Sequence, residues 1–263
     1  MKLNDAVVLI TGSGTGVGAA CARQFAAKGA RIVVNYSRSQ REAEETAANC
    51  AAQGVEVEIV KADVADDAAC RAMVARATER WGRLDALVNN AAITKKSDPF
   101  DLETLSAQDF HDVFAVNVIG AYQMARAAIP AMRASGGGAI VNVSSTAAFT
   151  GGGSSLAYAA SKGALNALTL ALARTNGPEI RVNAVCPGVI DTRWMRDAVG
   201  PERYAAIEDR FARTAPLARV AQPEDVASAV VFLVEGADYV TGELLCLDGG
   251  IRLSGGLPRP PRR

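Results

Sequence analysis

The sequence predicts a single α/β domain with a seven-stranded parallel sheet covered by helices on both faces. Short strand-like runs recur along the chain at residues 6–11, 31–35, 55–60, 85–89, 138–143, 180–186 and 243–247. Helical patterns fill the intervals, and such alternation gives right-handed crossovers and a parallel, doubly wound sheet. No linker divides residues 1–252, and a chain of 263 residues suits one domain with a large core.

The first strand-like run leads directly into a glycine-rich turn and a helix. Ala6-Val-Val-Leu-Ile10 is short and apolar, as buried strands are, and glycines follow it at 12, 14, 16 and 18. The next stretch, Ala19–Ala27, is rich in helix formers. Glycine leaves backbone N–H groups uncovered, and the positive end of a helix dipole favours an anion. This strand, turn and helix therefore indicate a site for a pyrophosphate group.

The later runs place polar residues where further strands end. Asp63 follows the third run, Asn89 ends the fourth and Ser145 follows the fifth. Ligands of doubly wound sheets bind beyond the carboxyl ends of the strands, so these residues are expected to share one site with Gly12. After the last run, residues 253–263 are rich in proline and arginine, which predicts a flexible tail.

The composition excludes several classes of protein. The 28 basic and 28 acidic residues balance, so no overall charge draws the chain to nucleic acid or to an anionic membrane. The first residues, Met1-Lys-Leu-Asn-Asp5, are too polar for a signal peptide, and no run of about 18 apolar residues could span a membrane. We therefore expect a cytoplasmic protein without nucleic-acid or membrane partners.

Cysteine and histidine usage predicts neither a metal site nor a hydrolase. The five cysteines, at 21, 50, 70, 186 and 246, lack Cys-x-x-Cys spacing, so reduced core thiols are expected. A Ser-His-Asp hydrolase would need the single histidine, His111, as its base. The setting of His111 in Asp109-Phe-His-Asp-Val113 is typical of an exposed helical face. No metal is therefore predicted.

A tyrosine and a lysine stand four residues apart in Tyr158-Ala-Ala-Ser-Lys162, and Ser145 precedes them by thirteen residues. On a helix this spacing puts a phenol and an ammonium on one face, where the cation favours the phenolate and a bound sugar can contact both. A cation about 4 Å from the phenol, at an effective dielectric near 20, would lower a pKa of about 10 by about three units. We therefore expect the pKa of Tyr158 to lie close to neutrality.

Together these motifs resemble the short-chain dehydrogenase/reductase family, whose members have a Rossmann-type, doubly wound fold. The turn Thr11-Gly-Ser-Gly-Thr-Gly-Val-Gly18, the segment Leu87-Val-Asn-Asn-Ala-Ala92 and the segment Thr241–Gly250 fall at that family's positions, and the resemblance covers about residues 5–252. It implies an enzyme that moves a hydride between a nicotinamide cofactor and a ketone or secondary alcohol. It also implies a catalytic tetrad, which comprises Asn117, Ser145, Tyr158 and Lys162.

The resemblance gives each member of the tetrad a role. Tyr158 donates a proton to the ketone oxygen in the reducing direction, and Ser145 hydrogen-bonds that oxygen. Lys162 holds the nicotinamide ribose, and Asn117 supports a water in the proton relay.

The resemblance further implies which residues bind the cofactor. They belong to the glycine turn, the end of the second strand, the segments after the third and fourth strands, and the segment that covers the nicotinamide. In this sequence they are Gly12, Ser13, Gly14, Thr15, Gly16, Val17, Gly18, Asn35, Tyr36, Ser37, Arg38, Asp63, Val64, Asn89, Ala91, Pro187, Gly188, Val189 and Thr192.

The end of the second strand favours NADP(H) over NAD(H). NAD enzymes usually carry an acidic side chain here for the ribose 2′-hydroxyl, and this chain has none at Asn35, Tyr36 or Ser37. Arg38, the next residue, could pair with a 2′-phosphate through charge-assisted hydrogen bonds. The alternative is that Arg38 is a solvated first-turn residue, because Thr15 is neutral where many NADP-binding relatives carry a basic residue.

Residues 191–216 are expected to form a lid over a small-molecule carbonyl or alcohol substrate. Its apolar wall would comprise Trp194, Met195, Tyr204 and Phe211. The nearest resemblance is to 3-oxoacyl-[acyl-carrier-protein] reductases and to bacterial sugar or alcohol dehydrogenases. Docking of an acyl-carrier protein is disfavoured, because Arg133 stands alone before the fifth strand where those reductases carry a basic run, although other arginines could serve.

Two features bear on the activity within the family. Ala92 replaces the glycine of the family's Asn-Asn-Ala-Gly segment, and a Cβ there would strain the backbone or reshape the pocket. The spacing of Tyr158 and Lys162 argues against enoyl reductases, whose lysine lies further from the tyrosine; Leu165 stands seven residues after Tyr158.

Two alternatives to an NADP(H)-dependent enzyme stay open. One is a non-catalytic NADP-binding sensor or scaffold, against which the complete tetrad argues. The other is an NAD-dependent sugar or alcohol dehydrogenase. By resemblance the assembly is a homotetramer. The helix after Tyr158 supports this expectation with small residues that would let two copies pack closely, at Ala159, Ala160, Gly163, Ala164 and Ala167.

Overall fold

A computed structural model describes residues 1–254 of the chain, and it contains one seven-stranded parallel sheet. The strand order is β3-β2-β1-β4-β5-β6-β7, so the predicted doubly wound α/β fold is confirmed. All seven predicted strands are present within about two residues of their expected bounds. They are β1 (Val7–Ile10), β2 (Arg31–Tyr36), β3 (Val57–Lys61), β4 (Ala86–Asn89), β5 (Gly138–Val143), β6 (Ile180–Pro187) and β7 (Leu244–Leu247).

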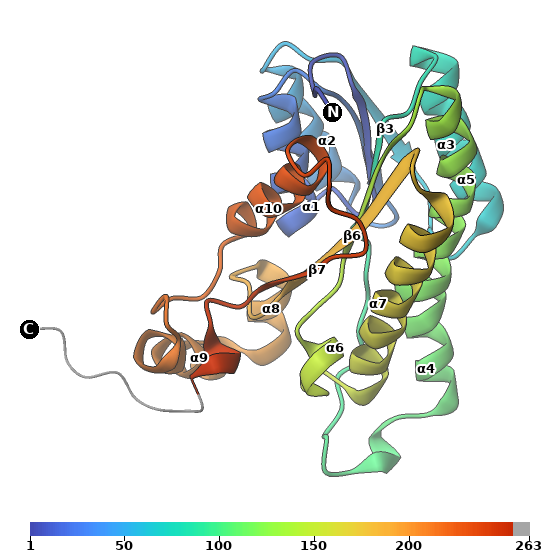
Figure 1. The fold of residues 1–263 in the computed structure, drawn as a ribbon. Coiled ribbons are helices and arrows are strands. Elements are labelled where there is room, and N and C mark those ends of the chain that lie inside the picture. The colour runs from blue at the N-terminus through green and yellow to red at the C-terminus, as the bar shows by residue number, and fades with distance from the viewer. Residues whose placement is uncertain (255–263) are drawn as a thin grey trace, which may run out of the picture.

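Helices cover both faces of the sheet (Figure 1). One layer comprises α1 (Gly16–Ala26), α2 (Gln40–Ala51) and α10 (Pro223–Glu235). The other comprises α3 (Asp67–Trp81), α4 (Ala107–Phe114), α5 (Ala121–Ala134) and α7 (Leu156–Asn176). Strand residues alternate between two hydrophobic cores, since Val8 and Ile10 pack into the first and Val7 and Leu9 into the second. Burial on both sides explains why β1 is a continuous apolar run.

The helix that carries Tyr158 and Lys162 begins at a defined side-chain cap. Ser155 precedes α7 in an extended conformation, and its Oγ accepts a hydrogen bond from the backbone N–H of Tyr158 at 3.1 Å. Tyr158 therefore lies in the first turn of α7 and Lys162 in the next.

The predicted lid is a separate helical layer at the carboxyl ends of the strands (Figure 1). It contains α8 (Arg193–Val199) and α9 (Pro201–Thr214), which Gly200 joins with a φ of +80°. Shorter elements complete the described chain: η1 (Leu102–Thr104), the π-helical η2 (Ala115–Gly120), α6 (Ala147–Thr150) and η3 (Ile251–Leu253).

Two sequence-based expectations concern the ends and surfaces of the fold. Of the predicted tail at 253–263, only Leu253 and Ser254 are described, and residues 255–263 lie outside the described residues. Within residues 1–254, each helix is too short or too polar to cross a membrane.

Candidate active site

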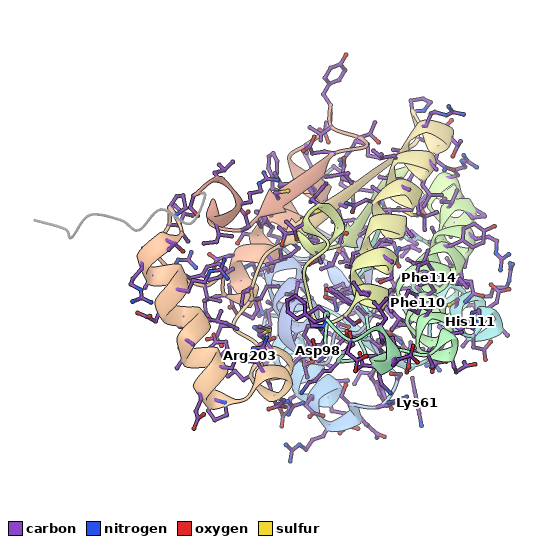
Figure 2. The ribbon with its side chains drawn as sticks, turned by 90° about the horizontal axis from the view of Figure 1, so that it is seen from below. Lys61, Asp98, Phe110, His111, Phe114 and Arg203 are labelled. Carbon is purple, nitrogen blue, oxygen red and sulfur yellow. The ribbon has the colours of Figure 1, made fainter. Side chains whose placement is uncertain are left out.

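The predicted site residues gather at the carboxyl edge of the sheet. The strand order reverses between β1 and β4, so the crevice lies where Gly12 follows β1 and Asn90 follows β4. Figure 2 looks onto this edge, with the loop that carries Asp98 between α9, which carries Arg203, and α4. The expected placement of the glycine turn, Asp63, Asn89 and Ser145 at one edge follows directly from this topology.

Tyr158, Ser145 and Lys162 converge beyond the end of β5. The Ser145 Oγ accepts a hydrogen bond from the Ala147 N–H at 3.1 Å and lies within hydrogen-bonding reach of Tyr158. The Lys162 Nζ lies 5.6 Å from the centre of the Tyr158 ring. The same Nζ donates to the carbonyl oxygen of Val143, the last residue of β5, at 2.8 Å. The end of β5 and the first two turns of α7 therefore fix the three groups relative to one another.

The pKa values of this group correct one expectation. Burial raises the pKa of Tyr158 above its ordinary value, and the hydrogen bond with Ser145 opposes this rise. Burial also lowers the pKa of Lys162 to about 8. The expected fall of the Tyr158 pKa toward neutrality is wrong for this structure, because the ammonium lies beside the ring and is bound to the Val143 carbonyl. Tyr158 therefore keeps its proton at neutral pH.

Asn117 joins the segment after β4 to the catalytic helix. It is buried in the π-helical turn η2, a local irregularity that often marks functional sites. Its Oδ1 accepts from the Ile93 N–H at 2.8 Å, and its Nδ2 donates to the Ile93 carbonyl and to the Ser161 Oγ, both at 3.0 Å. Both amide hydrogens are used, so the side chain itself positions the site.

The turn after β1 has the shape and polarity to receive an anion. Gly12 has a φ of +62°, and a Cβ on it would lie 3.0 Å from the Cα of Ala91. A Cβ on Gly18 would lie only 2.6 Å from the Asn90 Nδ2. The first turn of α1 contains no acidic residue, and Thr15 before it makes no capping side-chain hydrogen bond. The first N–H groups of α1 are therefore free to bind a pyrophosphate, which fits a dinucleotide cofactor.

Asn90 is a site residue that the sequence reasoning missed. Its Nδ2 donates to the carbonyls of Thr11 and Gly12 at 2.9 and 3.0 Å, which ties the end of β4 to the glycine turn. The backbone N–H groups of Asn90 and Ala91 both donate to the Thr11 Oγ1 at 3.0 Å. A polar residue at the end of a strand beside the reversal in strand order was the available indication.

Asn35 and Ser13, two of the residues predicted to bind the cofactor, support the turn from below through their side chains. Asn35 is buried, and its Oδ1 accepts from the Gly12 N–H at 3.0 Å. Its Nδ2 donates to the carbonyls of Val60 and Ala62 at 3.2 and 3.1 Å. The Ser13 Oγ donates to the Ile10 carbonyl at 2.8 Å and accepts from the Asn35 N–H at 2.9 Å.

Arg38 is an exposed cation between β2 and α2. Tyr36 is buried, whereas Ser37 and Arg38 are exposed just before α2. The start of α2 packs against the glycine turn, since a Cβ on Gly14 would lie 3.0 Å from the Ser39 Oγ. Within the described residues 1–254, Arg38 forms no ion pair and no side-chain hydrogen bond. Its charge therefore stays available beside the turn.

The segments after β3 and β4 differ in what they expose. Asp63 is exposed, and its Oδ1 accepts from the Ala65 N–H at 3.0 Å. Val64 is buried, and its carbonyl accepts from the Gln123 Nε2 at 2.7 Å. The Asn89 side chain is also buried and donates to the Asn142 Oδ1 at 2.9 Å, so it bridges β4 and β5. The side chains of Val64 and Asn89 are thus structural.

Ala92 fits its position without backbone strain. Among the described residues, the non-glycine residues with positive φ are Asp5 and Ala218. The exposed Ala92 therefore has an ordinary backbone conformation, and its Cβ does not strain the backbone.

The segment after β6 leads into the lid against the glycine turn. The Pro187 carbonyl accepts from the Thr146 N–H at 2.9 Å, and a Cβ on Gly188 would lie 3.1 Å from the Asp248 Cβ. The Thr192 Oγ1 caps α8 by accepting from the Met195 N–H at 3.1 Å. The Thr192 Cγ2 lies 3.6 Å from the position of a Cβ on Gly16. The lid therefore meets the start of α1, and Val189 packs into its base.

The four apolar lid residues differ in how far they are exposed. Trp194 is half exposed, with its ring centroid 6.3 Å from that of Tyr158, and Met195 is half-buried beside it. Tyr204 and Phe211, the other two residues predicted for the substrate wall, are buried. Tyr204 packs under Arg196, and burial together with the Asp191 carboxylate raises its pKa to about 12. Phe211 belongs to the hydrophobic core of the lid itself.

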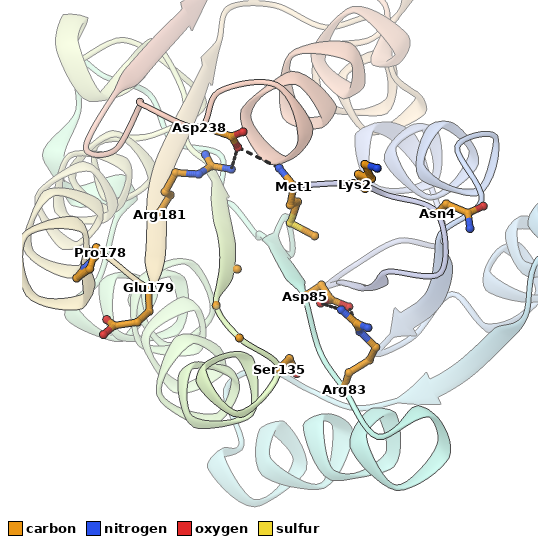
Figure 3. A pocket seen from close by; sticks show the side chains of 13 residues that line it. Met1, Lys2, Asn4, Arg83, Asp85, Ser135, Pro178, Glu179, Arg181 and Asp238 are labelled. Atoms are coloured by element: carbon orange, nitrogen blue, oxygen red, sulfur yellow. Dashed lines mark hydrogen bonds and ion pairs between the residues drawn. The ribbon is translucent and has the colours of Figure 1, made fainter.

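A hollow of about 480 Å³ lies at the opposite, amino edge of the sheet (Figure 3). Its lining includes the Arg83–Asp85 ion pair and Arg181, which faces Asp238. None of the predicted site residues lines it. Because doubly wound sheets bind ligands at their carboxyl edge, the hollow is separate from the candidate active site.

In residues 1–254, the single histidine and the five cysteines form neither a disulfide nor a metal site. His111 is exposed near the end of α4 (Figure 2), as its sequence setting predicts. All five cysteines are unpaired; four are buried and Cys246 is half-buried, and burial raises the pKa of Cys21 to about 12. In the part of the chain that the structure describes, no three His, Cys, Asp or Glu side chains come together as metal ligands.

Known proteins resemble this chain over almost its whole length. A family model described as enoyl-(acyl carrier protein) reductase matches residues 12–252. A Streptomyces violaceoruber protein, named as ketoacyl reductase 2 of the granaticin polyketide synthase, is 43% identical over 94% of this chain and 96% of its own. The 2-(R)-hydroxypropyl-CoM dehydrogenase of Xanthobacter autotrophicus is 39% identical over 92% of this chain and 97% of its own.

The fold agrees with solved structures as well. A short-chain type dehydrogenase/reductase from Mycobacterium ulcerans superposes with a TM-score of 0.89 and 26% identity, over 98% of this chain and 94% of that chain. The matched relatives are named reductases and dehydrogenases, and the Ser145, Tyr158 and Lys162 side chains converge at the expected edge of the sheet. This chain therefore belongs to the short-chain dehydrogenase/reductase family of oxidoreductases.

Proposed function

We propose that this protein reduces a ketone to a secondary alcohol with NADPH, and that a 3-oxoacyl thioester is the first substrate class to test. The observation that carries the proposal is the convergence of Ser145, Tyr158 and Lys162 under the half-exposed Trp194. The similarity to a protein named as a ketoacyl reductase supports the same substrate class.

Proton transfer in this proposal begins at Tyr158. Because its raised pKa keeps it protonated at neutral pH, its hydroxyl donates a proton to the ketone oxygen as the alcohol forms. The Ser145 hydroxyl donates a hydrogen bond to the same oxygen and stabilises its developing negative charge. The reduced nicotinamide supplies the hydride when it is bound.

Lys162 supports both the proton donor and the cofactor. One of its three N–H donors is used on the Val143 carbonyl, so two remain for the hydroxyls of the nicotinamide ribose. Its ammonium lies 5.6 Å from the centre of the Tyr158 ring, so a ribose bound to it would lie next to the proton donor. Asn117 holds the catalytic helix in place through Ser161. Both N–H groups of its side-chain amide are already used as donors, so a relay water would have to bind another group of the site.

We favour reduction of C=O over the C=C reduction that the description of the matched family names. Lys162 stands one helical turn after Tyr158 and lies beside its ring. In enoyl reductases the lysine lies further from the tyrosine, and here Leu165, seven residues after Tyr158, is buried with 2% of its side chain exposed. Leu165 cannot replace an ammonium in this role.

The residues around the glycine turn support NADP(H) over NAD(H). Arg38 is an exposed cation without an ion-pair partner in residues 1–254, and it stands next to Ser39, which packs on Gly14. The carboxylate in the first turn of α2, Glu42, is paired with Arg193 at 3.0 Å. A 2′-phosphate would therefore meet an available guanidinium without an opposing free charge from Glu42.

The partner is inferred to be a free small molecule. Arg133, the one basic residue before β5, lies at the amino edge of the sheet and donates to the Asn176 Oδ1 at 3.1 Å, so it does not line the mouth of the site. We further infer that residues 1–252 act as one domain in a homotetramer. The unpaired state of all five cysteines supports a reducing, cytoplasmic environment.

The test is oxidation of NADPH and of NADH by the purified protein over a panel of ketones that includes acetoacetyl thioesters, simple sugars and diketones. We expect turnover with NADPH, and we expect Tyr158→Phe to lower it by about 10²–10⁴-fold while the Kd for NADPH is unchanged. A Phe variant with full activity would remove Tyr158 from the mechanism. Tight NADPH binding by the wild type without turnover on any ketone would favour the sensor or scaffold.

A further inference from the structure

We propose that Arg193 and Glu42 form a clamp that holds the lid over bound NADP(H) and sets the rate at which the cofactor leaves. The inference rests on the proposed function, because it concerns the cofactor that the glycine turn would bind. Arg193 is the first residue of α8, and Glu42 lies in the first turn of α2. The Arg193 Nη2 lies 3.0 Å from the Glu42 Oε1.

The two partners come from opposite sides of the anion site. On one side, the start of α2 packs on the glycine turn: a Cβ on Gly14 would lie 3.0 Å from the Ser39 Oγ, and the Thr46 Oγ1 donates to the Gly14 carbonyl at 3.2 Å. On the other side, Thr192 meets the position of a Cβ on Gly16 at 3.6 Å. The clamp therefore links two elements that flank the free N–H groups of α1.

Besides the clamp, the lid makes few polar side-chain contacts with the body of the protein. Its base is anchored at Asp191, which accepts from the Arg196 Nε and Nη2 at 2.7 Å and from the Gln222 Nε2 at 3.3 Å. The Lys96 Nζ donates to the Asp197 carbonyl at 3.3 Å. Among residues 1–254, the clamp is the only ion pair between α8 or α9 and an element of the main sheet layers. Opening the lid away from the glycine turn therefore has to break it.

The charges of the clamp are present at neutral pH and reach water. Hydrogen bonds from its own backbone and from Arg193 hold the pKa of Glu42 below its ordinary value. The side chains of Arg193 and Glu42 are 65% and 23% exposed, so the pair is screened by salt. An exposed pair of this kind shifts an opening equilibrium by up to about fivefold.

A competing explanation makes the opposite prediction for one variant. In this explanation Arg193 binds the cofactor phosphates and pairs with Glu42 only while no cofactor is bound. Loss of the Glu42 charge would then release Arg193 and tighten cofactor binding. If the pair is a clamp, loss of either partner frees the lid and speeds cofactor release.

The experiment is stopped-flow displacement of NADPH, followed by nucleotide fluorescence, for Glu42→Gln, Arg193→Gln and the double variant. We expect each single variant to speed release by about two- to fivefold, and the double variant to do no more. The charge-reversed pair Glu42→Arg with Arg193→Glu should restore slow release. Asp209→Asn and Arg213→Gln are matched controls, because this pair lies within α9, where it bridges nothing to the body.

A second measurement needs no cofactor. Trp194 follows Arg193 directly, and the chain has two tryptophans, so Trp81→Phe leaves Trp194 as the sole fluorescent reporter of the lid. In this background we expect acrylamide to quench Trp194 more strongly once either clamp residue is neutralised, and high salt to have the same effect on the intact pair. Slower NADPH release by Glu42→Gln, additive effects in the double variant, or unchanged quenching in both neutral variants would overturn the clamp. If the wild type turned over no ketone while the variants released NADPH at the expected rates, the proposed function would be overturned and the clamp would stand.

Discussion

Lys162 is the residue in which burial and charge conflict most. Its side chain is 2% exposed, and the Val143 carbonyl is its hydrogen-bond acceptor in the described structure. Burial lowers its pKa from 10.5 to about 8, so the folded protein holds the ammonium less readily than the unfolded chain does. A buried cation that lowers stability is expected where the charge serves the chemistry.

This conflict predicts that Lys162→Met stabilises the fold while it removes turnover. The pKa difference of about 2.5 units corresponds to about 3 kcal/mol at neutral pH, and part of this gain is lost because the Val143 carbonyl becomes unpaired. We expect a net increase of about 1–2 kcal/mol in the free energy of unfolding, measured by urea denaturation at pH 7.

The advantage of the Met variant depends on pH. Between pH 8 and pH 10.5 the unfolded chain binds more protons at Lys162 than the folded protein, so the stability of the wild type rises with pH across this window. The Met variant lacks this contribution. Its advantage should therefore shrink from pH 7 to pH 10, and an advantage that is the same at both pH values would show that desolvation of the ammonium is not its cause.

At the scale of elements, one buried amide holds three strands in register at the active site. Asn35 lies near the carboxyl end of β2. Its side chain forms hydrogen bonds with the backbone of Gly12 after β1 and of Val60 and Ala62 at the end of β3. The alternative of leaving these groups unpaired is costly, because each buried donor or acceptor loses its contacts with water.

We therefore expect Asn35→Ala to lower the free energy of unfolding by about 2–4 kcal/mol. It should also weaken NADPH binding, because the Gly12 turn loses a support. Chemical denaturation and nucleotide titration measure the two effects. Asn49→Ala, at an exposed position of α2, is the matched control and should change neither quantity by more than about 0.5 kcal/mol. A loss as small as that of the control would mean that the strand ends are held by their backbone ladder alone.

Features that depend on a local sequence pattern could be predicted, whereas features that depend on long-range contacts could not. The strands, the glycine turn and the Tyr158–Lys162 pair depend on local patterns, and each appears where the pattern predicts it. Roles that depend on long-range contacts could not be predicted in this way. The inward orientation of Asn35 and the pKa of Tyr158 follow from tertiary packing, which a linear motif does not specify.

The same limit applies to the lid. Tyr204 and Phe211 have the apolar character of a substrate wall, but both are buried, Tyr204 under Arg196 and Phe211 in the hydrophobic core of the lid, while the Trp194 ring lies 6.3 Å from that of Tyr158. Which face of an amphipathic helix meets its own layer is decided by the neighbouring elements. Asn90 was missed for a related reason, because its partners on the glycine turn lie 78 and 79 residues away in sequence.

At the scale of the whole molecule, the outer face of α7 carries small residues that no other part of residues 1–254 covers. Ala160 and Ala167 are exposed, and a Cβ on Gly163 would have no neighbour within 4 Å. Leu170, on the same helix, is 47% exposed. The spacing of these residues places them on one stripe, while the opposite face of α7 packs on the sheet through Leu165 and Thr169. Core packing therefore uses one face of α7, and the other face is left for the expected close approach of a second copy.

The homotetramer stays a prediction, and the α7 stripe provides its test. Ala167→Arg introduces a long charged side chain where two copies of α7 would approach closely, so we expect the native mass in sedimentation equilibrium to fall to half that of the wild type. The monomer fold should be kept, because Ala167 is exposed. Ala72→Arg, at an exposed position of α3, carries the same new charge and should leave the mass unchanged. If Ala167→Arg kept the full tetramer mass, the two-fold contact would have to lie on another surface of the molecule; if the wild type were already monomeric, the assembly expected from the family would be absent from this chain.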